Sequence, residues 1–79
     1  MSDFYLLTRD ECHLCTQAML MIHKAPVEEP IRLHLVDIEK QADLQQEYGL
    51  LIPVLIREVD DAELKWPFNE QQLVEFLQV

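Results

Sequence analysis

The sequence predicts an α/β domain with a four-stranded mixed sheet flanked by helices, in the order β-α-β-α-β-β-α. Two observations lead to this prediction. Short apolar runs of strand length alternate with segments of helical periodicity over the first half of the chain. An acidic turn then separates two further strand-like segments, which favours an antiparallel hairpin before a last helix. With 79 residues the chain has room for one domain, which we expect to span residues 1–79.

The first elements are a strand and a helix. Residues 4–7 form a short, aromatic-rich apolar run that is typical of a buried strand. Apolar residues then recur one helical turn apart and predict a helix that ends at Pro26. The members of this stripe are Leu14, Ala18, Met21, Ile22 and Ala25. With the strand that follows, these elements form a βαβ unit, which is right-handed and has parallel strands.

The middle of the chain continues this alternation. Residues 31–36 show a period of two and predict the second strand. A short helix follows from about Lys40 to Tyr48. Gly49, the single glycine of the chain, comes directly after this helix, where we expect the left-handed conformation of a helix C-cap.

The last third predicts a hairpin and a helix. The third strand begins at or just after Pro53, because proline cannot donate a hydrogen bond to a sheet ladder. The acidic turn at Asp60 and Asp61 leads into the fourth strand, over residues 62–66. Asn69, with Gln72 three residues later, resembles a capping box and predicts the start of the final helix.

The net charge and the hydropathy of the chain exclude some classes of binding partner. The net charge is −9, from 15 acidic and 6 basic residues. Such a surface repels phosphate backbones and anionic lipid, so we expect neither nucleic acid nor a membrane as a partner. The acidic residues form a solubilising surface or steer the protein towards a basic partner protein. The chain shows no long apolar run and no signal peptide, and we expect a cytoplasmic monomer.

The most informative segment is Cys12-His13-Leu14-Cys15, directly after a strand and at the start of a helix. The first helical turn presents unpaired N–H groups and a positive dipole end, which stabilise a thiolate there. Two cysteines one turn apart can close a disulfide. Isolated structural disulfides are rare in the cytoplasm, so the pair indicates chemistry. We expect Cys12 to be the exposed nucleophile and Cys15 the more buried resolving cysteine.

The neighbours of the pair leave alternatives open. His13, as a cation, would stabilise a Cys12 thiolate, or it faces solvent without a role. Asp10 and Glu11 disfavour a thiolate through their negative charge. A closed zinc site needs four ligands, and no second CxxC exists in the chain. We therefore expect no metal site, with a Cys/His metal carrier at residues 12–15 as the alternative.

Three segments together resemble the glutaredoxin-like branch of the thioredoxin superfamily, and in particular its small glutaredoxin-like proteins grouped as a domain of unknown function. They are the CxxC pair at residues 12–15, the Tyr-Gly-Leu-Leu-Ile-Pro-Val segment at 48–54 and the Leu-Lys-Trp-Pro-Phe segment at 64–68. The resemblance covers essentially the whole chain. It implies a thioredoxin-like fold in which the Ile52–Pro53 bond is cis and Pro53 faces the cysteines. The backbone of Ile52 would then be free to pair with an extended substrate.

The resemblance also indicates how glutathione would bind. Glutaredoxins use a basic residue before the CxxC, the residue before the cis-proline and a pair of glycines after the last strand. Arg9 and Ile52 occupy the first two places, whereas residues 66–68, Trp-Pro-Phe, replace the glycines. The acidic surface also disfavours this anionic tripeptide. We expect no bound cofactor, while glutathione stays open as a reductant.

The sequence thus predicts a thiol–disulfide oxidoreductase that acts in cell redox homeostasis. Its substrate would be a protein disulfide or a low-molecular-weight disulfide. Cys12 and Cys15 are the candidate catalytic residues, and the candidate substrate-binding residues are Arg9, His13, Ile52 and Pro53. The alternative is a thioredoxin-fold module that binds a protein partner and whose cysteines are not catalytic.

Overall fold

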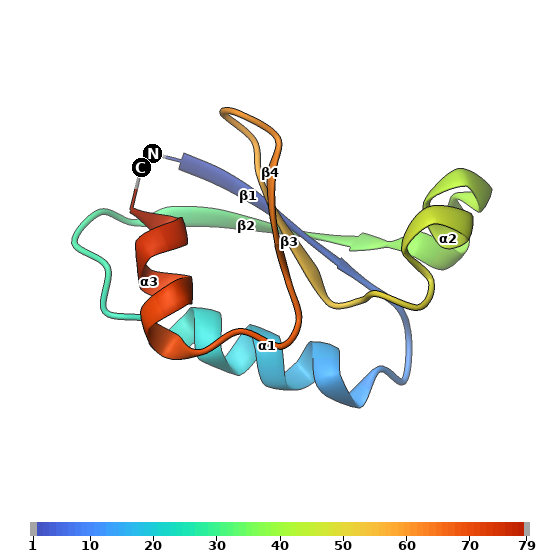
Figure 1. Cartoon of the computed structure of the whole chain (residues 1–79), viewed down its shortest axis with the longest axis horizontal. Helices are drawn as coiled ribbons and strands as arrows, with labels where there is room; N and C mark the ends of the chain where they lie inside the picture. The colour runs from blue at the N-terminus through green and yellow to red at the C-terminus, as the bar shows by residue number, and fades with distance from the viewer. Residues whose placement is uncertain (1, 79) are drawn as a thin grey trace.

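The computed structural model describes residues 2–78 and contains one four-stranded sheet in the order β2-β1-β3-β4 (Figure 1). The strands are β1 (Ser2–Thr8), β2 (Ile31–Asp37), β3 (Val54–Arg57) and β4 (Ala62–Lys65). The helices are α1 (His13–Lys24), the 3-10 turn η1 (Ile38–Lys40), α2 (Ala42–Tyr48) and α3 (Glu70–Leu77). β1 pairs in parallel with β2 and antiparallel with β3, which pairs antiparallel with β4. The predicted fold class and element order are confirmed.

The larger core lies on the sheet face that α1 and α3 cover (Figure 1). Its buried members are Phe4, Leu6, Ala18, Ile22, Leu55, Phe68, Leu73 and Leu77. A smaller core on the other face joins Leu7 and Val54 of the sheet to Ile38 and Tyr48. Figure 1 shows α2 beyond the end of β2, so it covers only part of this second face.

The second sheet face is polar near the start of β1, at the opposite end of this strand from the cysteines. Arg32 and His34 both bind the carboxylate of Asp3, at 2.9 and 2.8 Å. Hydrogen bonds from Arg32 and then His34 hold the pKa of Asp3 below its ordinary value. The ring of Tyr5 stacks on His34, with 4.8 Å between the ring centroids. These side chains explain why this part of the sheet needs no covering helix.

Gly49 differs from its prediction. Its backbone angles are φ −54° and ψ −32°, in the right-handed helical region. A Cβ atom there would lie 2.5 Å from the carbonyl oxygen of Gln45. The chain therefore needs glycine because the end of α2 brings the Gln45 carbonyl oxygen close to this position, and a left-handed turn is not the reason.

Two further expectations on burial and helix limits are corrected. Leu14 is exposed, and the buried stripe of α1 consists of Cys15, Ala18 and Ile22. The predicted helix over 40–48 begins only at Ala42, since residues 38–40 form the 3-10 turn. The capping box of Asn69 and Gln72 is present as predicted. Within residues 2–78, no helix has the length and apolar character needed to cross a bilayer.

Candidate active site

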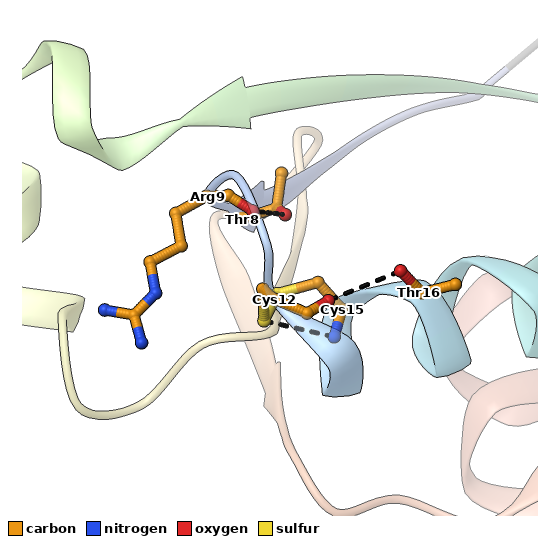
Figure 2. Close-up of a disulfide and its surroundings, with 5 residues drawn as sticks. All are labelled: Thr8, Arg9, Cys12, Cys15 and Thr16. Carbon is orange, nitrogen blue, oxygen red and sulfur yellow. Dashed lines mark hydrogen bonds between the residues drawn. A yellow bond between two sulfur atoms is a disulfide. The ribbon is translucent and has the colours of Figure 1, made fainter.

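Cys12 and Cys15 form a disulfide at the start of α1, with 5.2 Å between their Cα atoms (Figure 2). Cys12 is the N-cap residue and has an extended backbone, with φ −95° and ψ 102°. It is half-buried, whereas Cys15, one turn into the helix, is only 1% exposed. The difference in exposure follows from the fold, because Cys15 lies on the stripe of α1 that faces the sheet. The pair and its relative exposure agree with the prediction.

The sulfur of Cys12 lies where the unpaired N–H groups of the helix point. The backbone N–H of Cys15 donates a hydrogen bond to Cys12 Sγ at 3.2 Å. The carbonyl oxygen of Cys12 accepts from the backbone N–H of Thr16 at 3.2 Å and from its hydroxyl at 3.3 Å. These bonds fix the N-cap residue in place. Negative charge on this sulfur would be stabilised by the N–H group and by the helix dipole.

The loop between β1 and α1 brings acidic side chains next to the pair. Glu11 has a positive φ of 59°, which turns the chain sharply before Cys12. Asp10 and Glu11 are both exposed. Their carboxylates act against a Cys12 thiolate, in opposition to the helix N-terminus.

The disulfide lines a groove of about 540 Å³ between the first turns of α1 and the carboxyl ends of β1 and β2. The groove brings together four of the six predicted site residues, which are Arg9, Cys12, His13 and Cys15. Its other lining residues are Thr8, Asp10, Glu11, Thr16, Met19, Leu35 and Asp37. His13 is exposed at the first position of α1.

A second hollow lies on the other side of Arg9. It measures about 490 Å³ and is lined by Arg9 together with η1, α2 and the segment after α2, including Leu50 and Leu51. Figure 2 shows the Arg9 side chain extending away from the disulfide. Among residues 2–78, no carboxylate lies within ion-pair distance of Arg9, including those of the neighbouring Asp10 and Glu11. Its guanidinium is therefore not engaged by a carboxylate, although Glu39 and Glu47 also line this hollow and would oppose an anionic group there.

Ile52 and Pro53 line neither of these two hollows. The Ile52–Pro53 bond is cis, as the resemblance implies. The segment between α2 and β3 passes beside the loop that carries the disulfide (Figures 1 and 2). However, the backbone N–H of Ile52 donates to the carbonyl oxygen of Tyr48 at 3.2 Å. This N–H is therefore not free to pair with a substrate in this conformation.

The residues that replace the glycine pair of glutaredoxins pack into the fold. Phe68 is buried, and the half-buried Trp66 meets it edge-on, with 5.1 Å between the ring centroids. The Trp66–Pro67 bond is also cis, and the backbone N–H of Trp66 donates to the carbonyl oxygen of Pro53 at 3.3 Å. No cluster of three or more metal-ligating side chains is arranged around a common point in the part of the chain that the structure describes.

Sequence reasoning missed most of the groove. Met19, Leu35 and Asp37 come from two elements whose separation in sequence hides their proximity. Leu51, part of the apolar segment before Pro53, is 41% exposed and lines the second hollow. The position of Leu35 and Asp37 near the end of the second predicted strand could have indicated the groove. Residues at the carboxyl ends of neighbouring parallel strands meet at one edge of the sheet.

Comparisons with known proteins agree with this architecture. The family profile of the glutaredoxin-like domain (DUF836) matches residues 3–78. Two solved structures of one protein, structural genomics target XcR50 of X. campestris, are each 36% identical and have a TM-score of 0.80. The X-ray structure covers 94% of this chain and 93% of the other, and the solution structure 98% and 92%. No curated protein matches significantly. The chain belongs to the glutaredoxin-like domain family (DUF836) of the thioredoxin superfamily.

Proposed function

We propose that this protein is a cytoplasmic, monomeric thiol–disulfide oxidoreductase that works through Cys12 and Cys15. The observation that carries the proposal is the position of the Cys12 sulfur. It is half-exposed, bonded to Cys15, and held 3.2 Å from the backbone N–H of that residue at the start of α1. A leaving or attacking thiolate is favoured at such a place.

In the reducing direction, the Cys12 thiolate attacks one sulfur of a substrate disulfide. A bond forms between Cys12 and that sulfur, and the other substrate sulfur leaves as a thiolate that takes a proton from water. The Cys15 thiol then loses its proton and attacks Cys12 Sγ, which releases the second substrate thiol. The protein gives up two electrons and the Cys15 proton, which the second substrate thiolate takes up, and it ends as the Cys12–Cys15 disulfide. Oxidation of a dithiol substrate follows the reverse course.

The other predicted site residues have roles in this proposal. Arg9 would bind an anionic group of a substrate in the second hollow, because its guanidinium has no acidic partner among residues 2–78. His13, exposed beside Cys12, would stabilise the thiolate when it is protonated. Pro53, which is fully buried, would position the cis-proline loop beside the pair, and Ile52 would offer its carbonyl oxygen. Glutathione fits this scheme as a reductant, and no resident cofactor is required.

The test is disulfide reduction by wild type and two single variants. A reduced sample is mixed with a protein disulfide such as insulin, and the products are identified by mass spectrometry. We expect Cys12→Ser to lose turnover, and Cys15→Ser to accumulate a mixed disulfide at Cys12. Full activity of Cys12→Ser would refute the proposal and leave the alternative, a binding module with non-catalytic cysteines. The engaged N–H of Ile52 favours that alternative, since a substrate strand cannot use it.

A further inference from the structure

The groove beside the disulfide opens on the β2 side of the active site. Cys12 and Cys15 line it, but Ile52 and Pro53 do not. A segment that occupies this groove would reach the disulfide between α1 and β2, and any contact with the carbonyl oxygen of Ile52 would lie outside the groove. β2 is an edge strand of the sheet, so a bound segment can continue past it.

The groove has an apolar floor that the fold leaves uncovered. Leu33 and Leu35 face the same side of the sheet, because strand side chains alternate. Leu33 packs against the main core, whereas Leu35 is 56% exposed. Met19 of α1 lies opposite and lines the same groove. Covering this exposed leucine with an apolar side chain of a partner would remove apolar surface from water, which is favourable in free energy.

The rim of the groove is negatively charged. Asp10, Glu11 and Asp37 line it, and the Asp37 carboxylate also accepts the backbone N–H of Glu39 at 2.9 Å. Two basic groups also line the groove: His13, and Arg9, whose side chain extends away from the disulfide (Figure 2). The rim therefore complements a cationic segment and opposes an anionic one.

We infer that this groove is the docking site for a lysine- or arginine-rich segment of a partner polypeptide that also carries an apolar side chain and the exchanging disulfide. The inference rests on the proposed function, and it adds the class of substrate. Lysine or arginine side chains of the partner pair with the rim, its apolar side chain covers Leu35, and its disulfide meets Cys12. The sulfur, proton and electron transfers are those already given for the reducing direction.

The test uses three short peptides that differ only in the residues flanking a leucine and a mixed disulfide. The flanking residues are lysine, glutamine or glutamate. Second-order rate constants for oxidation of the reduced protein are measured at about 0.1 M salt, where the Debye length is about 10 Å and only nearby charges act. The readout is the ratio of the lysine-peptide rate to the glutamine-peptide rate, because this ratio cancels any change in thiol reactivity.

The key variant is Asp10→Asn combined with Asp37→Asn, in which the asparagine at 37 keeps an oxygen for the Glu39 N–H. Its matched control, Glu28→Gln with Glu29→Gln, removes two charges from exposed positions that do not line the groove. We expect the ratio to fall about fivefold in the groove variant and by less than about 1.5-fold in the control. An equal change in both variants, or none in the groove variant, would overturn the docking site.

A second pair of variants tests the apolar floor. Leu35→Ser should slow the reaction with both the lysine and the glutamine peptide about threefold, because the peptide leucine loses its contact. Leu20→Ser is the control, since Leu20 is 53% exposed on α1 and does not line the groove. Equal rates in the two variants would contradict the proposal. If the reduced wild type reacts with none of the three peptides and with no neutral small disulfide, the proposed function itself fails.

Discussion

The backbone N–H of Cys15 donates a hydrogen bond to the Sγ atom of Cys12, 3.2 Å away, so the proposed resolving residue also holds the sulfur of the proposed nucleophile. One helical turn provides both relationships, because the N-cap side chain accepts from the N3 backbone N–H. The same turn buries Cys15 against the sheet and leaves Cys12 half-exposed. A CxxC at a helix start therefore creates two chemically different thiols.

This asymmetry predicts selective alkylation of the reduced protein. At neutral pH, iodoacetamide should modify Cys12 at least about tenfold faster than Cys15, because Cys12 is exposed and lies at the helix N-terminus. Peptide mapping by mass spectrometry after short reaction times measures the two rates. The urea-unfolded protein is the control, and there the two rates should be equal. Equal rates in the folded protein would contradict this assignment of roles.

The close approach at Gly49 predicts a cost for any side chain there. Gly49→Ala places a Cβ atom against the Gln45 carbonyl oxygen, so the end of α2 or the following segment has to move. We expect a loss of about 1–3 kcal/mol in the free energy of unfolding, measured by urea denaturation. Gln46→Ala, at an exposed position of α2, should stay within about 0.5 kcal/mol. A stable Gly49→Ala protein would refute the steric explanation.

The contact between Tyr48 and Glu63 predicts that the free energy of unfolding changes at alkaline pH. The Tyr48 hydroxyl donates to the Glu63 carboxylate, and this bond, followed by burial, raises the pKa of Tyr48 above its ordinary value of 10.0. The unfolded chain then loses this proton at a lower pH than the folded protein. Wild type therefore loses stability as the pH rises above the unfolded pKa.

The comparison is with Tyr48→Phe, in a background where both cysteines are serine to avoid thiol chemistry. Near neutral pH the variant should be about 1 kcal/mol less stable, because one hydrogen bond is lost. The difference should shrink between about pH 9 and about pH 11, as measured by urea denaturation at each pH. A difference that stays constant over this range would show that the hydrogen bond does not control the ionisation.

The turn between β3 and β4 predicts a residue preference at position 61. Asp61 has φ 57°, a left-handed conformation that aspartate tolerates and a β-branched residue does not. Asp61→Val should lower the free energy of unfolding by about 1–2 kcal/mol. Asp61→Gly, which accepts this φ, should stay within about 0.5 kcal/mol of wild type. Thermal denaturation distinguishes the two, and equal losses would contradict the argument from backbone conformation.

Local patterns sufficed to predict the element order. The alternation over residues 31–36, the proline that starts β3 and the capping box at Asn69 each depend on contacts within a few residues. Each of these signals appears in the structure. The CxxC at the start of α1 also belongs to this group, because the N-cap geometry and the exposure of the two cysteines follow from helix periodicity.

The errors arise where distant segments meet. Leu14 was placed on the apolar stripe of the first helix, yet which leucines are covered depends on how α1 sits on the sheet. The error at Gly49 is local instead: it was assigned a left-handed cap, whereas the close approach to the Gln45 carbonyl oxygen, four residues earlier, is what requires it. Periodicity reports which side chains share a face, and it does not report how far a neighbouring element extends over that face.

The sequence by itself determined the fold class, the disulfide pair and its two unequal members, because these depend on short-range periodicity and on the chemistry of a helix N-terminus. Only the tertiary structure decided what surrounds the pair. It left Leu35 uncovered beside the disulfide, directed Arg9 away from it and engaged the Ile52 N–H with Tyr48. The physical reason is that the surroundings of a site depend on the packing of helices against a sheet, which is set by the sum of many contacts distant in sequence.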